Sequence, residues 1–236
     1  SYTNNGNTIR YDAPTSLQQL EQVLSENPAA KIIAAGTDLS LEITQSLREF
    51  SHIVNVSSVK ELQKIRDGRS ELEIGSAVTY QDASDSLFNY WPGLEAFLRR
   101  FASLPIKNWA TIGGNIANGS PIGDTPPPFI VLGAELALRR GSEHRMMPLE
   151  EFFLDYGKQD LRTGEFVEAV RIPKLKEGVR FRVYKITKRI DEDISSVLGA
   201  FRIDMDEDGG ITDARVAFGG MAATPKRASG AATSMK

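Results

Sequence analysis

The chain has 236 residues, of which 41% are hydrophobic and 25% are charged, and its formal net charge is −3. This balance is ordinary for a globular protein and excludes the strongly basic surface that nucleic-acid binding requires. No apolar run approaches the roughly 20 residues of a membrane-spanning helix, and the first residues lack a signal-peptide pattern. We therefore expect a cytoplasmic protein that binds neither nucleic acid nor membrane.

Cysteine is absent, and the two histidines, His52 and His144, are far apart in the sequence. The lack of cysteine excludes disulfides, thiolate nucleophiles and cysteine-ligated iron–sulfur clusters from this chain. Neither histidine stands at metal-ligand spacing, so we expect no metal site.

The first predicted element is a helix over residues 15–26, which the Asn27–Pro28 pair ends. Thr15 and Gln18 fit a capping box at its start. One face of this helix collects the apolar residues Leu17, Leu20, Val23 and Leu24.

A strand, a helix and a second strand follow. Residues 31–35 (KIIAA) and 52–56 (HIVNV) have the β-branched composition of buried strands, and residues 38–50 have helical spacing. With the tight turn AGTD at 35–38, this order predicts a βαβ unit.

The rest of the chain is mostly strand-like. A strand at 72–78 and two helices around 79–90 and 93–103 precede a glycine-rich stretch at 111–125 (TIGGNIANGSPIGDT). Residues 197–220 predict two strands joined by an acidic glycine turn, which is typical of a hairpin. Further strands are expected at 134–140, 165–172 and 179–189.

We expect an α+β fold in three parts. A small βαβ unit occupies residues 1–60, and an antiparallel sheet with helices occupies residues 61–176. A third unit begins at residue 177, within a hinge at 174–178.

Two segments offer binding chemistry. In the first, KIIAAGTDLSL at 31–41, a buried strand turns into a helix through Ala35, Gly36 and Thr37. Such a turn presents free backbone N–H groups to a phosphate, and Asp38 can cap the helix or bind a ribityl or sugar hydroxyl. The alternative is an ordinary turn with an N-cap.

The second segment is the glycine-rich stretch. Gly113, Gly114 and Asn115 tolerate positive φ, so their N–H groups can converge on an anion, with Ser120 and Asp124 as further donor and acceptor. The alternative is a flexible surface loop, although Ile112, Ile116 and Ile122 argue against it. Neither segment matches a GxGxxG fingerprint or a P-loop, and together they favour a dinucleotide.

These residues resemble a known family. AAGTDL, followed about seventy residues later by WATIGGNIANGSPIGDTPP, is similar to the FAD-binding domain of the molybdenum hydroxylases, most of all to the small subunit of bacterial xanthine dehydrogenases. KRIDEDIS and ARVAFGGMAATPKRA extend the likeness over nearly the whole chain. The resemblance implies a two-part PCMH-type FAD-binding domain at 1–176 and the start of a truncated C-terminal domain like that of the CO dehydrogenase flavoprotein at 177–236.

The resemblance also implies how FAD is held. The pyrophosphate would lie on the main-chain N–H groups of Lys31, Ile32, Ile33, Ala34, Ala35, Gly36, Thr37 and Asp38. The second wall would be Thr111, Ile112, Gly113, Gly114 and Asn115, and Asp124 would bind the ribose–adenine side or the ribityl chain. Leu39, Phe101, Ala102 and Ile194 would lie near the flavin ring, although Phe101 alone suggests core packing. Ala35 replaces a common glycine of the family and would cost about 1 kcal/mol if that position needs positive φ.

The implied role is that of a flavin module with no catalytic side chain of its own. Electrons from xanthine oxidation at a molybdenum cofactor in a large subunit would cross 2Fe–2S clusters, which lie outside this chain, and FAD would pass hydride to NAD⁺. We therefore expect a hetero-oligomer. The charge run at 188–193 (KRIDED) either orders the nicotinamide or, as we favour, is simply solvated. The alternatives are a flavin subunit of an aldehyde or carbon monoxide dehydrogenase and a non-catalytic nucleotide-binding module.

Overall fold

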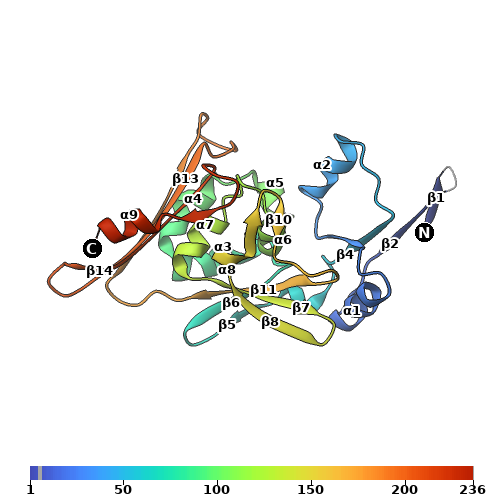
Figure 1. The fold of residues 1–236 in the computed structure, drawn as a ribbon, viewed down its shortest axis with the longest axis horizontal. Helices are drawn as coiled ribbons and strands as arrows, with labels where there is room; N and C mark the ends of the chain where they lie inside the picture. Colours follow the sequence, from blue (N-terminus) through green and yellow to red (C-terminus); the bar gives the residue numbers. More distant parts are fainter. Residues whose placement is uncertain (5–6, 236) are drawn as a thin grey trace.

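The computed structural model describes residues 1–4 and 7–235, and the strands within these ranges form four sheets. Figure 1 shows the N-terminal strands at one end of the molecule and the C-terminal hairpin at the other, with most helices gathered between them. Helices accompany mainly antiparallel sheets, so the predicted α+β fold is confirmed.

The N-terminal sheet has the order β1-β2-β4-β3, with β1 at Tyr2–Asn4, β2 at Asn7–Asp12, β3 at Lys31–Ile33 and β4 at His52–Asn55. β3 and β4 are parallel neighbours connected through α2 (Leu39–Thr44), so the predicted βαβ unit is confirmed. β1 and β2 lie outside the predicted elements.

Two helices of this unit differ from their predicted bounds. α1 (Leu17–Glu26) is capped by Ser16, whose Oγ accepts from the Gln19 N–H at 3.3 Å, so the N-cap lies one residue later than predicted. The Gln19 side chain accepts from the Thr15 N–H at 2.8 Å and does not complete a capping box with Ser16. α2 ends at Thr44, well before residue 50, because Leu47 has a φ of 51°, which an α-helix does not tolerate. Of the apolar residues at helical spacing, Ile43 and Leu47 are open to solvent, at 40% and 82% exposure, whereas Leu39 is half-buried.

The middle sheet has the order β5-β6-β11-β7-β8 and is antiparallel throughout. Its strands are β5 (Ile65–Asp67), β6 (Glu71–Gly75), β7 (Glu135–Arg140), β8 (Glu143–Pro148) and β11 (Phe166–Pro173). A two-stranded sheet pairs β9 (Phe153–Asp155) with β10 (Lys158–Gln159). The accompanying helices are α3 (Tyr80–Tyr90), α4 (Glu95–Arg100), α5 (Leu104–Lys107), α6 (Ile112–Asn118), α7 (Pro126–Leu132) and α8 (Leu149–Phe152), with 3-10 turns at Lys60–Gln63 and Pro92–Leu94.

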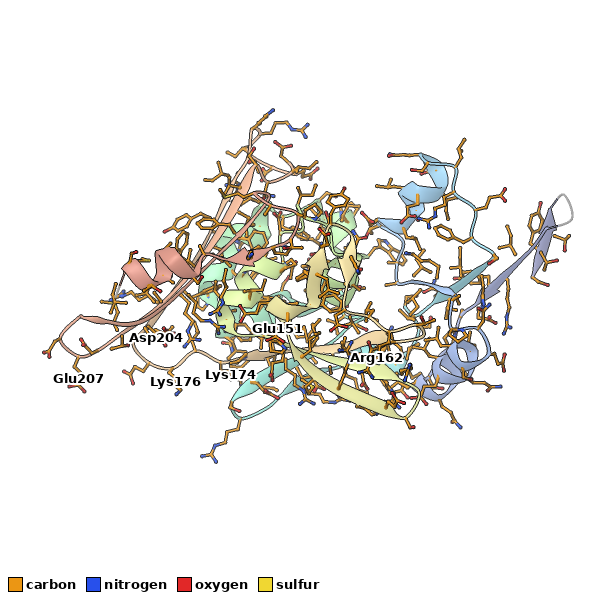
Figure 2. All side chains as sticks on the ribbon, in the orientation of Figure 1. Glu151, Arg162, Lys174, Lys176, Asp204 and Glu207 are labelled. Atoms are coloured by element: carbon orange, nitrogen blue, oxygen red, sulfur yellow. The ribbon has the colours of Figure 1, made fainter. Side chains whose placement is uncertain are left out.

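The C-terminal sheet joins β12 (Val179–Ile186), β13 (Val197–Met205), β14 (Ile211–Gly219) and β15 (Lys226–Arg227) in sequence order, before α9 (Ser229–Ser234). β13 and β14 form the predicted antiparallel hairpin. Every residue of α7 is buried, and this helix packs against β13 and β14. One apolar core therefore runs from the middle sheet into the C-terminal sheet, while Lys176 and Glu207 point outward into solvent (Figure 2).

The glycine-rich stretch contains a helix, which corrects the expectation of a loop. Thr111 caps α6 through its Oγ1, which accepts from the Gly114 N–H at 3.0 Å, and Gly119 ends the helix at a φ of 64°. Ile112 and Ile116 are fully buried on one face of the helix. The first glycine is required by packing, because a Cβ on Gly113 would lie 2.3 Å from the Cβ of Ser76.

Candidate cofactor-binding site

A cavity of about 430 Å³ lies where the segment after β3 faces α6. Most of the predicted site residues meet in it, namely residues 31–39 together with Phe101, Thr111, Gly113, Gly114, Asn115 and Asp124. Three of the predicted site residues do not line the cavity. Ile112 is buried in the core, Ala102 follows Phe101 at a φ of 49°, and Ile194 is 63% exposed in the connection between β12 and β13.

One wall of the cavity is a segment of backbone donors, residues 34–39, here called the N–H segment. Within the described part of the chain, the backbone N–H groups of this segment have no protein acceptor. Gly36 turns the chain at a φ of 77°, and Ala35 keeps a negative φ, so the strain expected for Ala35 does not arise. The side chain of Asp38 makes no capping bond. Successive free N–H groups on a concave surface are a typical anion-binding arrangement.

The opposite wall is α6, and its backbone donors are already used. The N–H of Ile112 donates to the Val78 carbonyl at 3.0 Å, and the N–H of Gly113 donates to the Ser76 carbonyl at 3.2 Å. Gly113 and Gly114 are helical and have no positive φ, so the anion nest predicted for residues 113–115 does not form. This wall instead offers glycines, which let a ligand lie close to the backbone, and the side chain of Asn115.

Asn115 carries an unpaired buried atom. Its Oδ1 is buried and has no hydrogen-bond partner among the described residues, although it lines the cavity. Native structures satisfy nearly all buried polar atoms, and leaving one unpaired costs about 1–3 kcal/mol. The amide therefore points to a ligand hydroxyl or amine in the cavity.

A buried triangle of side chains closes one part of the cavity wall. Lys185 donates from Nζ to Oδ2 of Asp124 at 2.6 Å and to Oγ of Ser195 at 2.8 Å. Ser195 in turn donates to Oδ1 of Asp124 at 2.6 Å. Sequence reasoning missed Lys185 and Ser195. The alternation of Phe181 and Val183 on β12 offered a signal, because Lys185 continues that buried face.

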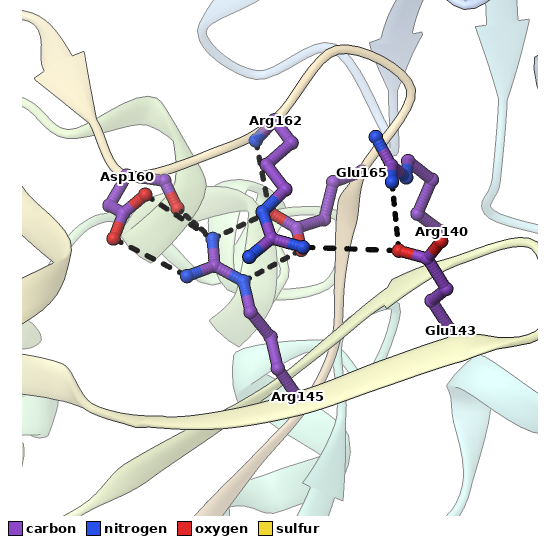
Figure 3. Close-up of polar contacts among 6 residues, drawn as sticks. All are labelled: Arg140, Glu143, Arg145, Asp160, Arg162 and Glu165. Carbon is purple, nitrogen blue, oxygen red and sulfur yellow. Dashed lines mark hydrogen bonds and ion pairs between the residues drawn. The ribbon is translucent and has the colours of Figure 1, made fainter.

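A second carboxylate in the wall, Glu165, is held by Arg145 (Figure 3). Arg145 donates from Nε and Nη2 to the two carboxylate oxygens at 2.8 and 2.7 Å, and also binds Asp160. Burial alone would raise the pKa of Glu165, but the guanidinium of Arg145 and the N–H of Arg162 hold it below its ordinary value. Both buried carboxylates of the cavity wall are therefore paired with a cation, Asp124 with Lys185 and Glu165 with Arg145.

Phe101 packs against other aromatic rings and also lines the cavity. Its ring packs on Tyr80, with centroids 4.5 Å apart, and on Phe97 at 5.9 Å.

In the charge run at 188–193, Arg189 donates to Asp193 at 2.9 Å and lowers the pKa of that carboxyl to about 2. The Arg189 side chain is 75% exposed.

Comparison with known protein families identifies this arrangement. Residues 7–175 match the model described as the FAD binding domain in molybdopterin dehydrogenase. The chain belongs to this family of FAD-binding domains. Residues 182–236 also match the CO dehydrogenase flavoprotein C-terminal domain, so the fold expected from the resemblance is confirmed.

Individual proteins are similar to the chain over most of its length. The chain is 33% identical to the xanthine dehydrogenase FAD-binding subunit of Escherichia coli, over 92% of the chain and 75% of that protein. It is 30% identical to the xanthine dehydrogenase of Emericella nidulans over 89% of the chain, but spans only 16% of that protein's length. The solved carbon monoxide dehydrogenase from Hydrogenophaga pseudoflava matches 97% of this chain and 80% of its own with a TM-score of 0.89 and 25% identity.

The residues present fit FAD. The cavity falls within the size range of ligand pockets, and its N–H segment can bind a pyrophosphate without a phosphate-binding lysine. The unpaired Asn115 amide supplies a further polar partner, and the Phe101 ring supplies an apolar surface.

No helix in the described ranges is long and apolar enough to cross a membrane. In the same ranges no group of three histidine, aspartate or glutamate side chains is placed to hold a metal ion.

Proposed function

We propose that this chain is the FAD-binding module of a xanthine dehydrogenase. The observation that carries the proposal is the cavity in which the N–H segment faces the unpaired amide of Asn115. The likeness to the E. coli FAD-binding subunit supports the choice of xanthine dehydrogenase within the family. We propose a domain boundary at residue 176, in the exposed connection before β12.

Within this proposal, residues 31–38 hold the pyrophosphate of FAD through the backbone. Thr111, Gly113, Gly114 and Asn115 form the facing wall, with Ile112 buried in the core next to them, and Asp124 binds the ribose–adenine side or the ribityl chain. Leu39, Phe101, Ala102 and Ile194 lie toward the flavin ring. Lys185 fixes Asp124, because it occupies one carboxylate oxygen and neutralises the charge next to an anionic ligand.

When bound, FAD supplies the redox chemistry, taking up electrons delivered from xanthine oxidation through 2Fe–2S clusters and reducing NAD⁺. The clusters and the molybdenum cofactor belong to other regions or subunits, so we propose a cytoplasmic hetero-oligomer with a molybdenum-containing large subunit. The chain's own residues bind the cofactor, orient it and shield it from water.

Anaerobic titration of the FAD-loaded chain with NADH tests the choice of acceptor. We expect the visible absorbance band of the flavin to bleach in proportion to the NADH added, with dithionite as the control for full reduction. A flavin that dithionite reduces but NADH does not would contradict NAD⁺ as the acceptor.

A second candidate is the flavin subunit of a carbon monoxide dehydrogenase, which the 0.89 TM-score favours. The assembled enzyme distinguishes the two. Flavin reduction by xanthine supports the first proposal, and reduction by carbon monoxide alone supports the second.

A further inference from the structure

Tyr80 touches three separate segments around the cavity without lining it. It is 1% exposed and begins α3. Its ring packs against Phe101 with centroids 4.5 Å apart. Its N–H donates to the Ala110 carbonyl at 3.0 Å, and its hydroxyl is hydrogen-bonded to Oγ1 of Thr125.

Each contact supports a part of the wall. Phe101 and Ala110 line the cavity themselves, and Thr125 directly follows Asp124, which also lines it. Thr125 is 2% exposed, and within the described residues its Oγ1 has no partner other than Tyr80. The Tyr80 hydroxyl is therefore one of the side-chain anchors of the loop at 119–125, together with the Lys185–Asp124 ion pair.

We propose that Tyr80 is a positioning residue that holds Phe101 and the loop at 119–125 in the geometry that retains FAD. The inference rests on the proposed function, since it assumes that this cavity holds FAD. Tyr80 acts through its neighbours because it has no surface in the cavity.

The electrostatic surroundings keep the anchor in one protonation state. Burial raises the pKa of Tyr80 far above its ordinary value, and the negative charge of Asp124 adds to this effect. The hydroxyl therefore remains a neutral donor and acceptor across the physiological pH range.

The two parts of the side chain can be tested separately. Tyr80→Phe keeps the ring against Phe101 and removes the hydroxyl, while Thr125→Val removes the other end of the same hydrogen bond. The rate of FAD release is followed by the recovery of flavin fluorescence on dilution. We expect each variant to release FAD about three- to tenfold faster than the wild type.

The double variant decides whether the bond itself is responsible. If it is, Tyr80→Phe with Thr125→Val releases FAD no faster than either single variant, because the second change removes nothing more. Independent, multiplying effects would contradict the proposal, as would an unchanged release rate in Tyr80→Phe.

Tyr90→Phe is the matched control. Tyr90 lies at the other end of α3 and donates its hydroxyl to Asp67, away from the cavity. We expect its FAD release rate to equal that of the wild type. An acceleration equal to that of Tyr80→Phe would mean that any weakening of α3 has this effect, and would overturn the specific role of Tyr80.

Hydrogen exchange separates a failure of this inference from a failure of the proposed function. If the wild type binds no FAD, the proposed function is wrong, but Tyr80 can still be tested as an anchor of the loop. The N–H groups of Gly123 and Gly220 donate to Ser120 and Pro121 of that loop at 2.9 and 3.0 Å. We expect both amides to exchange several-fold faster in Tyr80→Phe than in the wild type; equal rates would overturn the inference.

Discussion

Lys185 on β12 forms a buried ion pair with Asp124 in the cavity wall, with 2.6 Å between Nζ and Oδ2 and side chains only 3% and 8% exposed. The pair connects the C-terminal sheet to the loop that precedes α7. Buried charges are tolerated only when they are paired and hydrogen-bonded, and Ser195 completes the set. The C-terminal sheet therefore holds in place a residue of the cavity wall, Asp124.

Replacing Lys185 with methionine is expected to destabilise the fold. Asp124 would remain buried with only Ser195 as a partner, and breaking a buried pair in this way costs about 3–5 kcal/mol. Urea unfolding measures the loss. Lys188→Met on the exposed turn is the control and should change stability by less than about 0.5 kcal/mol. A loss of under about 1 kcal/mol in Lys185→Met would show that the pair contributes little.

Gly113→Ala is expected to disturb the packing of α6 on β6. The added methyl group would lie 2.3 Å from the Cβ of Ser76 and 2.5 Å from its Cα, so the helix must shift, at a cost of about 1–3 kcal/mol. Gly230→Ala is the control, because Gly230 lies in α9 with open space around it. We expect thermal unfolding to show a lower Tm for the first variant and an equal or higher Tm for the second; equal effects would contradict the close approach at Ser76.

The Arg145–Glu165 pair predicts a pH dependence. Since the folded-state pKa of Glu165 lies below its ordinary value of 4.5, the pair stabilises the fold above about pH 4.5 and loses this effect as the pH falls through the folded-state pKa. Glu165→Gln should therefore lose about 2 kcal/mol near neutral pH and progressively less in acid, as measured by urea unfolding.

Glu143→Gln is the matched control for that experiment. Glu143 is 61% exposed and pairs with Arg140 at 2.8 Å (Figure 3), so its replacement should cost less than about 0.5 kcal/mol. A Glu165→Gln difference that stays constant from about pH 7 to about pH 3 would contradict the linkage.

Asn115→Ala is expected to weaken FAD binding without lowering the stability of the cofactor-free chain. Because Oδ1 of Asn115 has no protein partner, the cofactor-free chain should be as stable as the wild type or more stable. FAD binding should weaken about tenfold to a hundredfold, as followed by flavin fluorescence. Asn89→Ala on the exposed face of α3 should leave FAD binding unchanged. Unaltered FAD affinity in Asn115→Ala would remove this residue from the site.

The sequence predicted the sheets better than the local backbone of the site. Alternating or β-branched apolar runs identified β4, β11, β12 and the β13–β14 hairpin, because their burial patterns follow directly from residue type. The run at 31–35 also identified β3, but this strand covers only Lys31–Ile33 and none of its residues is buried, so the expectation of a buried strand is wrong there. The glycines at 113 and 114 suggested a loop, since glycine weakens helices. Thr111 as a cap, together with buried Ile112 and Ile116, outweighs that preference.

The two glycine-bearing segments could be predicted to form one site, but their partners could not. Lys185, Ser195, Arg145 and Glu165 reach the cavity wall from distant positions in the sequence, so no local pattern connects them. Only the position of Lys185 on the buried face of β12 marked it as unusual. The exposed apolar residues of α2, in contrast, show that helical spacing alone does not guarantee burial.

Titration of the purified chain with FAD, and in parallel with FMN, tests the central claim most directly. The two ligands share the flavin ring, but only FAD has the pyrophosphate assigned to the N–H segment. We expect one FAD per chain, a yellow flavin spectrum, and binding of FMN at least about a hundredfold weaker. A chain that binds neither ligand, or that binds FMN as tightly as FAD, would contradict the account.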